Sequence, residues 1–204
     1  RQDETLKLPE LPSLSTGEKP DLKMDAESPV WKTRYAQRIE QARAEAPRNE
    51  RLRYTLQAYL PKVQHNRYNV EVLLALADLQ RHHIEMVIGM AQVEQDLLKA
   101  AHLSDKAQAM GLLVKAHGTV DRIIEDSNRT FANLKMVWEK SMFPKNRTVD
   151  GKAYLHVMDD VKDHFADRRV DIDYMIAPEQ RMNLPEFRSK LSQLIRDYAK
   201  AQNM

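Results

Sequence analysis

The chain contains the stretch RYNVEVLLALADLQRHHIEMVIGMAQVEQDLLKAA (residues 67–101), in which apolar residues recur at alternating steps of three and four. Because these steps bracket the helical repeat, they place the apolar side chains along one side of an α-helix. The main stripe, interrupted by one histidine, consists of Val72, Leu76, Leu79, His83, Met86, Met90, Val93 and Leu97. A parallel stripe contains Leu73, Ala77, Ile84, Val87, Ala91 and Leu98. The wide apolar surface predicts contacts with at least two neighbouring helices.

A second long stretch, residues 105–141, follows after a short connection around Ser104. Its stripe consists of Met110, Leu113, His117, Val120, Ile124, Phe131, Leu134 and Trp138. The sustained seven-residue repeat is typical of left-handed, coiled-coil-like packing. At about 1.5 Å per residue, each helix spans roughly 50 Å. The two stretches therefore predict an antiparallel helical hairpin.

The N-terminal segment, residues 1–28, differs in composition from the rest of the chain. It is rich in proline, and the phrase LPELPSLSTGEKP has neither a helical nor a strand period. Such composition favours an extended linker. The alternative is a strap that lies across another surface, anchored by Leu8, Leu11 and Leu14. Residues 29–204 are expected to form the helical domain.

Shorter helices are expected on both sides of the hairpin. Ser28 and Pro29 are suited to begin a helix, which Pro47 is expected to end, and a second helix should run from near Asn49 to Pro61. Further helices are predicted over residues 151–167 and from Leu184 onward. The predicted fold is an all-α antiparallel bundle of five to six helices built on the hairpin, with an extended proline-rich N-terminal segment.

Composition narrows the classes of function. The chain has 204 residues, 42% hydrophobic and 30% charged, with a net charge of +2. Basic and acidic residues are interleaved, so nucleic acid is not an expected partner. Without cysteine there is no disulfide, zinc–thiolate site or cysteine nucleophile, and no run reaches the roughly 20 apolar residues of a membrane span. The first residue is Arg1, which suggests a removed leader or a piece of a longer protein.

Two sets of helical residues invite a metal interpretation. His83 and His117 interrupt apolar stripes, and Asp78, His82 and Glu85 share one helix face at i, i+4 and i+7. Di-iron bundles, however, use Glu-x-x-His pairs, and this sequence contains none. Folding the hairpin about residue 103 or 104 leaves His83 and His117 roughly 10 Å apart along the axis, so hydrogen-bonded core histidines are the favoured interpretation of these two. No metal, cofactor or catalytic residue is predicted.

The densest polar cluster is HVMDDVKDHFADRR, residues 156–169. At 100° per residue, Tyr154, Met158, Val161 and Phe165 fall on one side of a helix. The polar side is formed by His156, Asp160, Asp163, His164 and Asp167. A solvated surface is its simplest interpretation, and the alternative is a face that docks onto another domain or a partner.

A resemblance to a known family begins near the end of the hairpin. NLKMVWEKSMFPKNRTVDGKAYLHVMDDVKDHFADRRVDIDYMIAPEQR (residues 133–181) resembles the C-terminal helical region of bacterial family-20-like, β-N-acetylhexosaminidase-like glycoside hydrolases. The similarity extends more weakly through HNRYNVEVLLALADLQRH (residues 65–82). In such enzymes an Asp-Glu pair at the end of a barrel strand performs the catalysis. No position here matches that pair, so no catalytic residue is carried over.

Three interpretations of function remain open. The resemblance implies a non-catalytic accessory domain of an exported carbohydrate-active enzyme, periplasmic or extracellular, whose partner is its own catalytic domain or a second copy. The alternative is a stand-alone bundle that binds a protein and has no link to sugars. The third is a metal-binding bundle that uses carboxylates and histidines.

Overall fold

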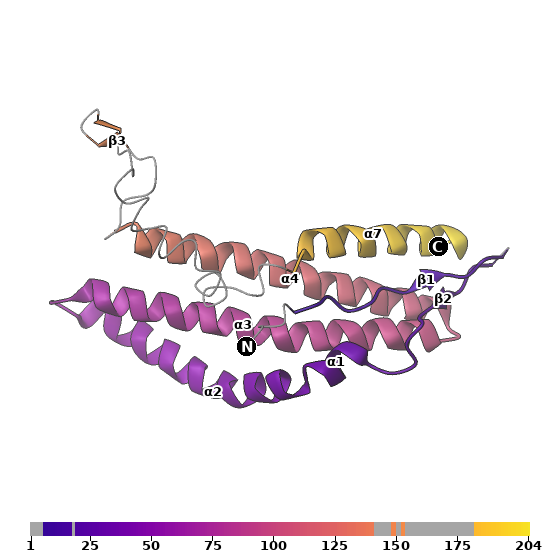
Figure 1. Cartoon of the computed structure of the whole chain (residues 1–204), viewed down its shortest axis with the longest axis horizontal. Coiled ribbons are helices and arrows are strands. Elements are labelled where there is room, and N and C mark those ends of the chain that lie inside the picture. The colour runs from indigo at the N-terminus through magenta and orange to yellow at the C-terminus, as the bar shows by residue number, and fades with distance from the viewer. Residues whose placement is uncertain (1–5, 18, 141–147, 150–151, 154–181) are drawn as a thin grey trace, which may run out of the picture.

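The computed structural model describes residues 6–17, 19–140, 148–149, 152–153 and 182–204. Helix α3 (Arg67–His102) and helix α4 (Lys106–Trp138) form the predicted antiparallel hairpin (Figure 1). The side chain of Asp105 begins α4 by accepting hydrogen bonds from the backbone N–H of Ala107 at 2.9 Å and of Gln108 at 3.0 Å. This N-cap satisfies donors that have no partner within the helix. The predicted hairpin is confirmed.

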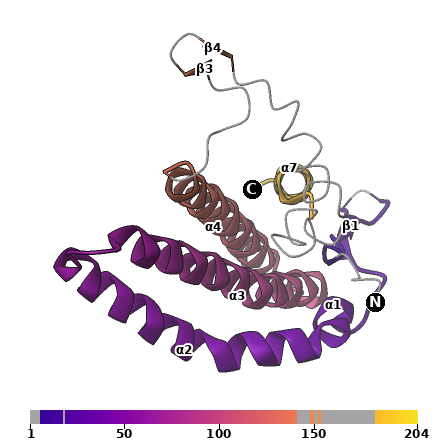
Figure 2. The same ribbon diagram turned by 60° about the vertical axis from the view of Figure 1, so that its left-hand side comes forward.

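Two helices precede the hairpin, and their boundary differs from the prediction. Helix α1 (Val30–Arg34) is followed by α2 (Ala36–Tyr59) and by a short 3-10 turn, η1 (Leu60–Lys62). Pro47 lies inside α2, so the prediction that it ends a helix is wrong. Proline removes the N–H that would bond to the Arg43 carbonyl, but both residues are exposed, so water can satisfy that carbonyl. Figure 2 shows α2 curved along α3 with its convex side outward.

The N-terminal segment lies against the bundle as a strap. Strands β1 (Ser13–Leu14) and β2 (Leu22–Lys23) pair antiparallel, with Leu14 opposite Leu22. Leu6 and Leu22 are buried within the hydrophobic core. Over its described residues, this segment is therefore a packed strap and not a free linker.

Hydrogen bonds tie the strap to α1 and α7. The backbone N–H of Lys7 donates to the Tyr35 hydroxyl at 3.0 Å, and the Trp31 indole N–H donates to the Lys7 carbonyl. Near the other end of the strap, the Gln202 side chain donates to the Pro20 carbonyl at 2.6 Å.

The last helix, α7 (Leu184–Ala201), packs on α4 with its apolar side inward. It begins as predicted, and the Asn183 side chain caps it by accepting from the Glu186 backbone N–H at 3.2 Å. Strands β3 (Thr148–Val149) and β4 (Lys152–Ala153) form a second short hairpin. Because Lys152 and Ala153 are extended, the predicted helix does not start at residue 151, and its continuation lies outside the described residues.

The core occupies the half of the hairpin where α3 turns into α4. Its fully buried centre includes Tyr198, Met86, Met90, Leu97, Leu113, Leu191 and Val120. The predicted stripe is thus buried from Met86 onward, whereas Leu76 is half exposed. None of the helices within the described ranges combines the length and apolar composition that a bilayer crossing requires. The all-α bundle on a long hairpin is confirmed.

Candidate functional site

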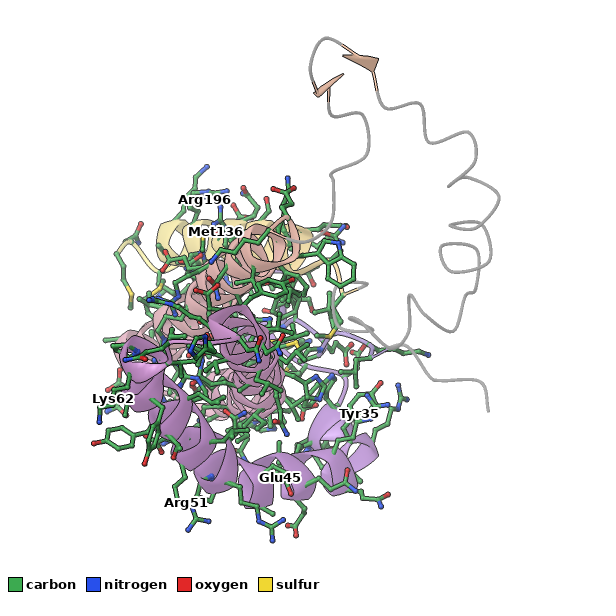
Figure 3. All side chains as sticks on the ribbon, turned by 90° about the vertical axis from the view of Figure 1, so that its left-hand side faces the viewer. Tyr35, Glu45, Arg51, Lys62, Met136 and Arg196 are labelled. Atoms are coloured by element: carbon green, nitrogen blue, oxygen red, sulfur yellow. The ribbon has the colours of Figure 1, made fainter. Side chains whose placement is uncertain are left out.

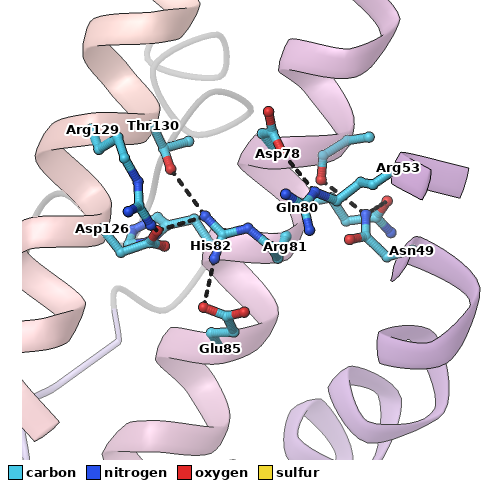
Figure 4. Close-up of polar contacts among 11 residues, drawn as sticks. Asn49, Arg53, Asp78, Gln80, Arg81, His82, Glu85, Asp126, Arg129 and Thr130 are labelled. Carbon is cyan, nitrogen blue, oxygen red and sulfur yellow. Dashed lines mark hydrogen bonds and ion pairs between the residues drawn. The ribbon is translucent and has the colours of Figure 1, made fainter. Parts of the chain in front are cut away.

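The most densely connected polar group on α3 and α4 centres on His82 and Asp126 (Figure 4). Nδ1 of His82 lies 2.9 Å from Oδ2 of Asp126, and both side chains are buried between the two helices. The edge of the His82 ring also meets the Phe131 ring, with centroids 6.3 Å apart. A buried imidazole paired with a carboxylate is a pattern that enzymes use to orient a base, so the surrounding residues decide its role.

Two arginines hold the other oxygen of Asp126. Arg81 donates to Oδ1 at 2.6 Å and Arg129 donates to the same oxygen at 2.5 Å. Arg81 also donates to Glu85 at 2.6 Å, within α3. Its remaining contact, to the Thr130 hydroxyl, is 3.5 Å long. The carboxylate of Asp126 is therefore fully engaged by three side chains.

These contacts shift the titration of both charged groups. Burial alone would raise the pKa of Asp126, but hydrogen bonds from Arg81, Arg129 and His82 lower that pKa to about 2. Burial likewise disfavours the charge on Arg81, yet its bonds to Asp126 and Glu85 raise its pKa above the usual value. A carboxylate with a pKa near 2 is a poor general base at neutral pH. The cluster joins α3 to α4 through ion pairs and hydrogen bonds.

A second polar group fastens α2 to α3. The side-chain amide of Asn49, buried in α2, donates to the Ala77 carbonyl at 2.9 Å and to the Gln80 side chain at 3.1 Å. One helical turn away, Arg53 forms an ion pair with Asp78 at 2.6 Å. Figure 4 shows this group on the opposite side of α3 from the Asp126 cluster.

The three residues considered as metal ligands therefore do not converge on one point. Asp78 faces Arg53 on α2, His82 faces Asp126 on α4, and Glu85 pairs with Arg81. Within the part of the chain that the structure describes, no group of three or more His, Cys, Asp or Glu side chains could hold a metal ion. Asp78 and His82 thus contact two different neighbouring helices, and Glu85 pairs within α3.

His117 is a hydrogen-bonded histidine at the α4–α7 contact. Its Nδ1 lies 3.0 Å from the Asp121 carboxylate, and its Nε2 lies 2.7 Å from the Ser192 hydroxyl. This confirms the predicted hydrogen bonding, although the residue lies at the edge of the core. His83 is half-buried on α3.

A cavity of about 340 Å³ lies beside the Asp126 cluster, between α2, α3 and α4. Its charged and polar lining consists of His82, Glu85, Thr119, Arg122 and Asp126. Its apolar lining consists of Ala46, Ile84, Met86, Ile88, Gly89 and Ile123. His82, Glu85 and Asp126 are already paired, and Arg122 donates to the Thr119 hydroxyl at 3.2 Å. Of these contacts, the His82–Asp126 pair joins α3 to α4, whereas Glu85 and Arg122 bond within their own helices.

Sequence reasoning identified His82 but missed Arg81 and Asp126. The signal was the antiparallel register: a hairpin that turns near Ser104 places residue 82 opposite residue 126. Counting along both stretches from Ser104 would have found the pair.

The predicted docking face (His156, Asp160, Asp163, His164 and Asp167) lies outside the described residues. No family model, curated protein or solved structure matches this chain.

Proposed function

We propose that this chain is a non-catalytic accessory helical domain of a larger exported carbohydrate-active enzyme. The proposal takes the enzyme class from the resemblance of residues 133–181 and 65–82 to β-N-acetylhexosaminidase-like glycoside hydrolases. In this role the bundle packs on the catalytic domain or joins two copies of the enzyme. Its partners are protein surfaces of the same parent protein.

The single observation that supports a structural role is the use made of Asp126. Its carboxylate accepts hydrogen bonds from Arg81 and Arg129 and lies 2.9 Å from Nδ1 of His82. A buried Asp–His pair is the arrangement most suited to acid–base chemistry among the described residues, and here it joins α3 to α4. An accessory domain needs such rigidity, because it must hold one surface in a fixed shape.

The test compares this chain with the protein encoded by its complete reading frame. We expect that frame to contain a barrel-sized domain directly before Arg1. We also expect the complete protein to hydrolyse a chromogenic N-acetylglucosaminide and this chain alone to give no turnover. Turnover by this chain that is abolished by mutating one of its carboxylates would overturn the proposal, as would a reading frame without an additional domain.

A second candidate is a protein-interaction module without a link to sugars. The observation in its favour is the set of large apolar side chains that are about half exposed or more, including Leu73, Leu76, Met136 and Trp138. A reading frame that encodes only this bundle would favour this candidate.

For a metal-binding bundle, stoichiometric iron, manganese or zinc in freshly purified protein would be the supporting result.

A further inference from the structure

The cavity between α2, α3 and α4 has an apolar interior and a charged mouth. Every residue of the apolar lining named above is buried or partly buried. Two charged residues of the lining, Glu85 and Arg122, are instead exposed, so they stand where the cavity meets solvent. An apolar interior with a few polar groups is typical of sites for small molecules, and a volume of about 340 Å³ lies at the lower end of their range.

Two small residues leave the space for this cavity. Gly89 on α3 has no side chain, and a Cβ atom there would lie 3.0 Å from Cδ1 of Ile123 and 3.5 Å from Cγ2 of Thr119. Helices α3 and α4 are therefore in contact on this side of the cavity. On the side of α2, the lining residue is Ala46, which is partly buried. A larger side chain at Ala46 would fill part of the volume.

Arginines outnumber carboxylates around the cavity. Glu85 and Asp126 line it, and both accept hydrogen bonds from Arg81 (Figure 4). Asp126 also accepts from Arg129. The two carboxylates are thus matched by two arginines. Arg122 is the third arginine, and it forms no ion pair with any residue that the structure describes, so its positive charge is available to a ligand.

The guanidinium of Arg122 is positioned at the mouth by the wall of the cavity. It donates to the Thr119 hydroxyl at 3.2 Å, and Thr119 is a buried residue of the lining. A guanidinium carries five N–H donors, so this bond leaves others for a second acceptor. Its planar fork matches the two oxygens of a carboxylate. The mouth therefore favours a ligand with a carboxylate group.

We propose that this cavity binds a small apolar monocarboxylate. The carboxylate pairs with Arg122, and the apolar body lies against Ile84, Ile88 and Ile123. By the roughly 30 Å³ that one water molecule occupies in the liquid, the volume suits a ligand of about ten non-hydrogen atoms. A ligand of this size with ordinary efficiency has a Kd of about 1 mM. This ligand site does not depend on the proposed function.

Binding of octanoate to the full-length chain tests the proposal, because its size and single carboxylate match the cavity. The measurement is nuclear magnetic resonance of isotope-labelled isoleucine methyl groups. We expect saturable shifts at Ile84, Ile88 and Ile123, and none at Ile39 and Ile195, which are not part of the lining. Octylammonium has the same chain and the opposite charge, so it should bind at least about fivefold more weakly.

Three results of this experiment would overturn the proposal. The first is the absence of saturable shifts at the three lining isoleucines. The second is an equal shift at all five isoleucines, which would mean that octanoate binds without a defined site. The third is equal affinity for octanoate and octylammonium, because the mouth would then not select an anion.

Replacing the arginine tests the carboxylate contact. Arg122→Gln should weaken octanoate binding by about fivefold and leave the binding of 1-octanol unchanged. The site is exposed, so the variant should fold like the parent protein. Arg51→Gln is the matched control, since Figure 3 shows Arg51 pointing away from the bundle on α2. An equal effect of both substitutions, or no effect of Arg122→Gln, would contradict the assigned role of Arg122.

Filling the cavity tests its location. Ala46→Leu should weaken octanoate binding by about tenfold or more, because the larger side chain occupies the space of the ligand. Ala44→Leu makes the same change at an exposed position of α2 and should leave binding unchanged. Circular dichroism verifies that both variants are folded, and Arg122→Gln tests the site even if Ala46→Leu does not fold. Unchanged binding by folded Ala46→Leu would overturn the proposal.

Discussion

The buried carboxylate of Glu94 on α3 accepts the backbone N–H of Trp31 at 2.6 Å, so the first turn of α1 is capped by a side chain from another helix. The second carboxylate oxygen accepts the N–H of Lys32 at 2.8 Å. Pro29, the N-cap residue of α1, makes no side-chain cap of its own. Glu94 therefore satisfies the amide donors of α1 and fixes that helix on the hairpin.

Replacing Glu94 should destabilise the protein. Glu94→Ala leaves the buried N–H of Trp31 and the partly buried N–H of Lys32 without acceptors, and we expect the free energy of unfolding to fall by about 2–3 kcal/mol. Glu94→Gln retains one acceptor, so its free energy of unfolding should lie between those of Glu94→Ala and the parent protein. The measurement is urea unfolding followed by circular dichroism. Glu40→Ala, at an exposed position of α2, is the control and should change stability by less than about 0.5 kcal/mol. Equal effects of Glu94→Ala and Glu40→Ala would contradict the capping role.

The lowered pKa of Asp126 makes a pH-dependent contribution to stability. Its pKa is about 2 in the folded protein against 3.8 for the ordinary group, so the folded state binds fewer protons. The contribution is complete above pH 4 or so and is lost as the pH falls through about 2. The shift corresponds to roughly 2 kcal/mol.

Asp126→Asn tests this contribution. At pH 7 we expect it to lower the free energy of unfolding by about 3 kcal/mol, because Arg81 loses a buried counter-ion. Between pH 5 and pH 2, the parent should lose about 2 kcal/mol more stability than the variant. Urea unfolding across this range checks both values. Asp197→Asn, at an exposed site on α7, is the control. Parallel pH profiles for the parent and Asp126→Asn would refute the assignment.

Pro47 should be a site where replacement stabilises the fold. Pro47→Ala restores the hydrogen bond from residue 47 to the Arg43 carbonyl and removes the ring from the middle of α2. We expect the melting temperature to rise, with a gain of about 1–3 kcal/mol in the free energy of unfolding. Pro185→Ala is the matched control, because Pro185 lies in the first turn of α7, where its missing N–H has no helical partner. A fall in stability for Pro47→Ala would indicate that the bend in α2 is needed for its packing on α3.

The sequence predicted those elements whose apolar pattern is long and regular. The two long helices of the hairpin were predicted because their stripes repeat over more than 25 residues, and α7 begins at Leu184 as predicted. Pro47 misled the prediction because the cost of an interior proline depends on whether water can reach the Arg43 carbonyl. That exposure is a property of the packed helix.

Contacts between residues that are far apart in the sequence could not be predicted from local patterns. Glu94 caps α1 from 63 positions along the chain, and Leu6 and Leu22 are buried without any periodic pattern. The contacts of Asp126 could be predicted only from the hairpin register, because a carboxylate on α4 has the same local pattern whether it is solvated or paired. Helical period identifies a buried side but not the neighbour that buries it.

The close approach of α3 and α4 at Gly89 gives a further prediction. A Cβ atom at Gly89 would lie 3.0 Å from Cδ1 of the buried Ile123, whereas a Cβ at Gly118 would meet nothing within 4 Å. Both glycines lie inside helices, where alanine is favoured by roughly 0.5–1 kcal/mol. Gly118→Ala should therefore gain about that amount in the free energy of unfolding. Gly89→Ala should gain less, because Cδ1 of Ile123 must first move aside. Urea unfolding of the two variants side by side decides the point, and an equal gain in both would mean that the hairpin is loosely packed at Gly89.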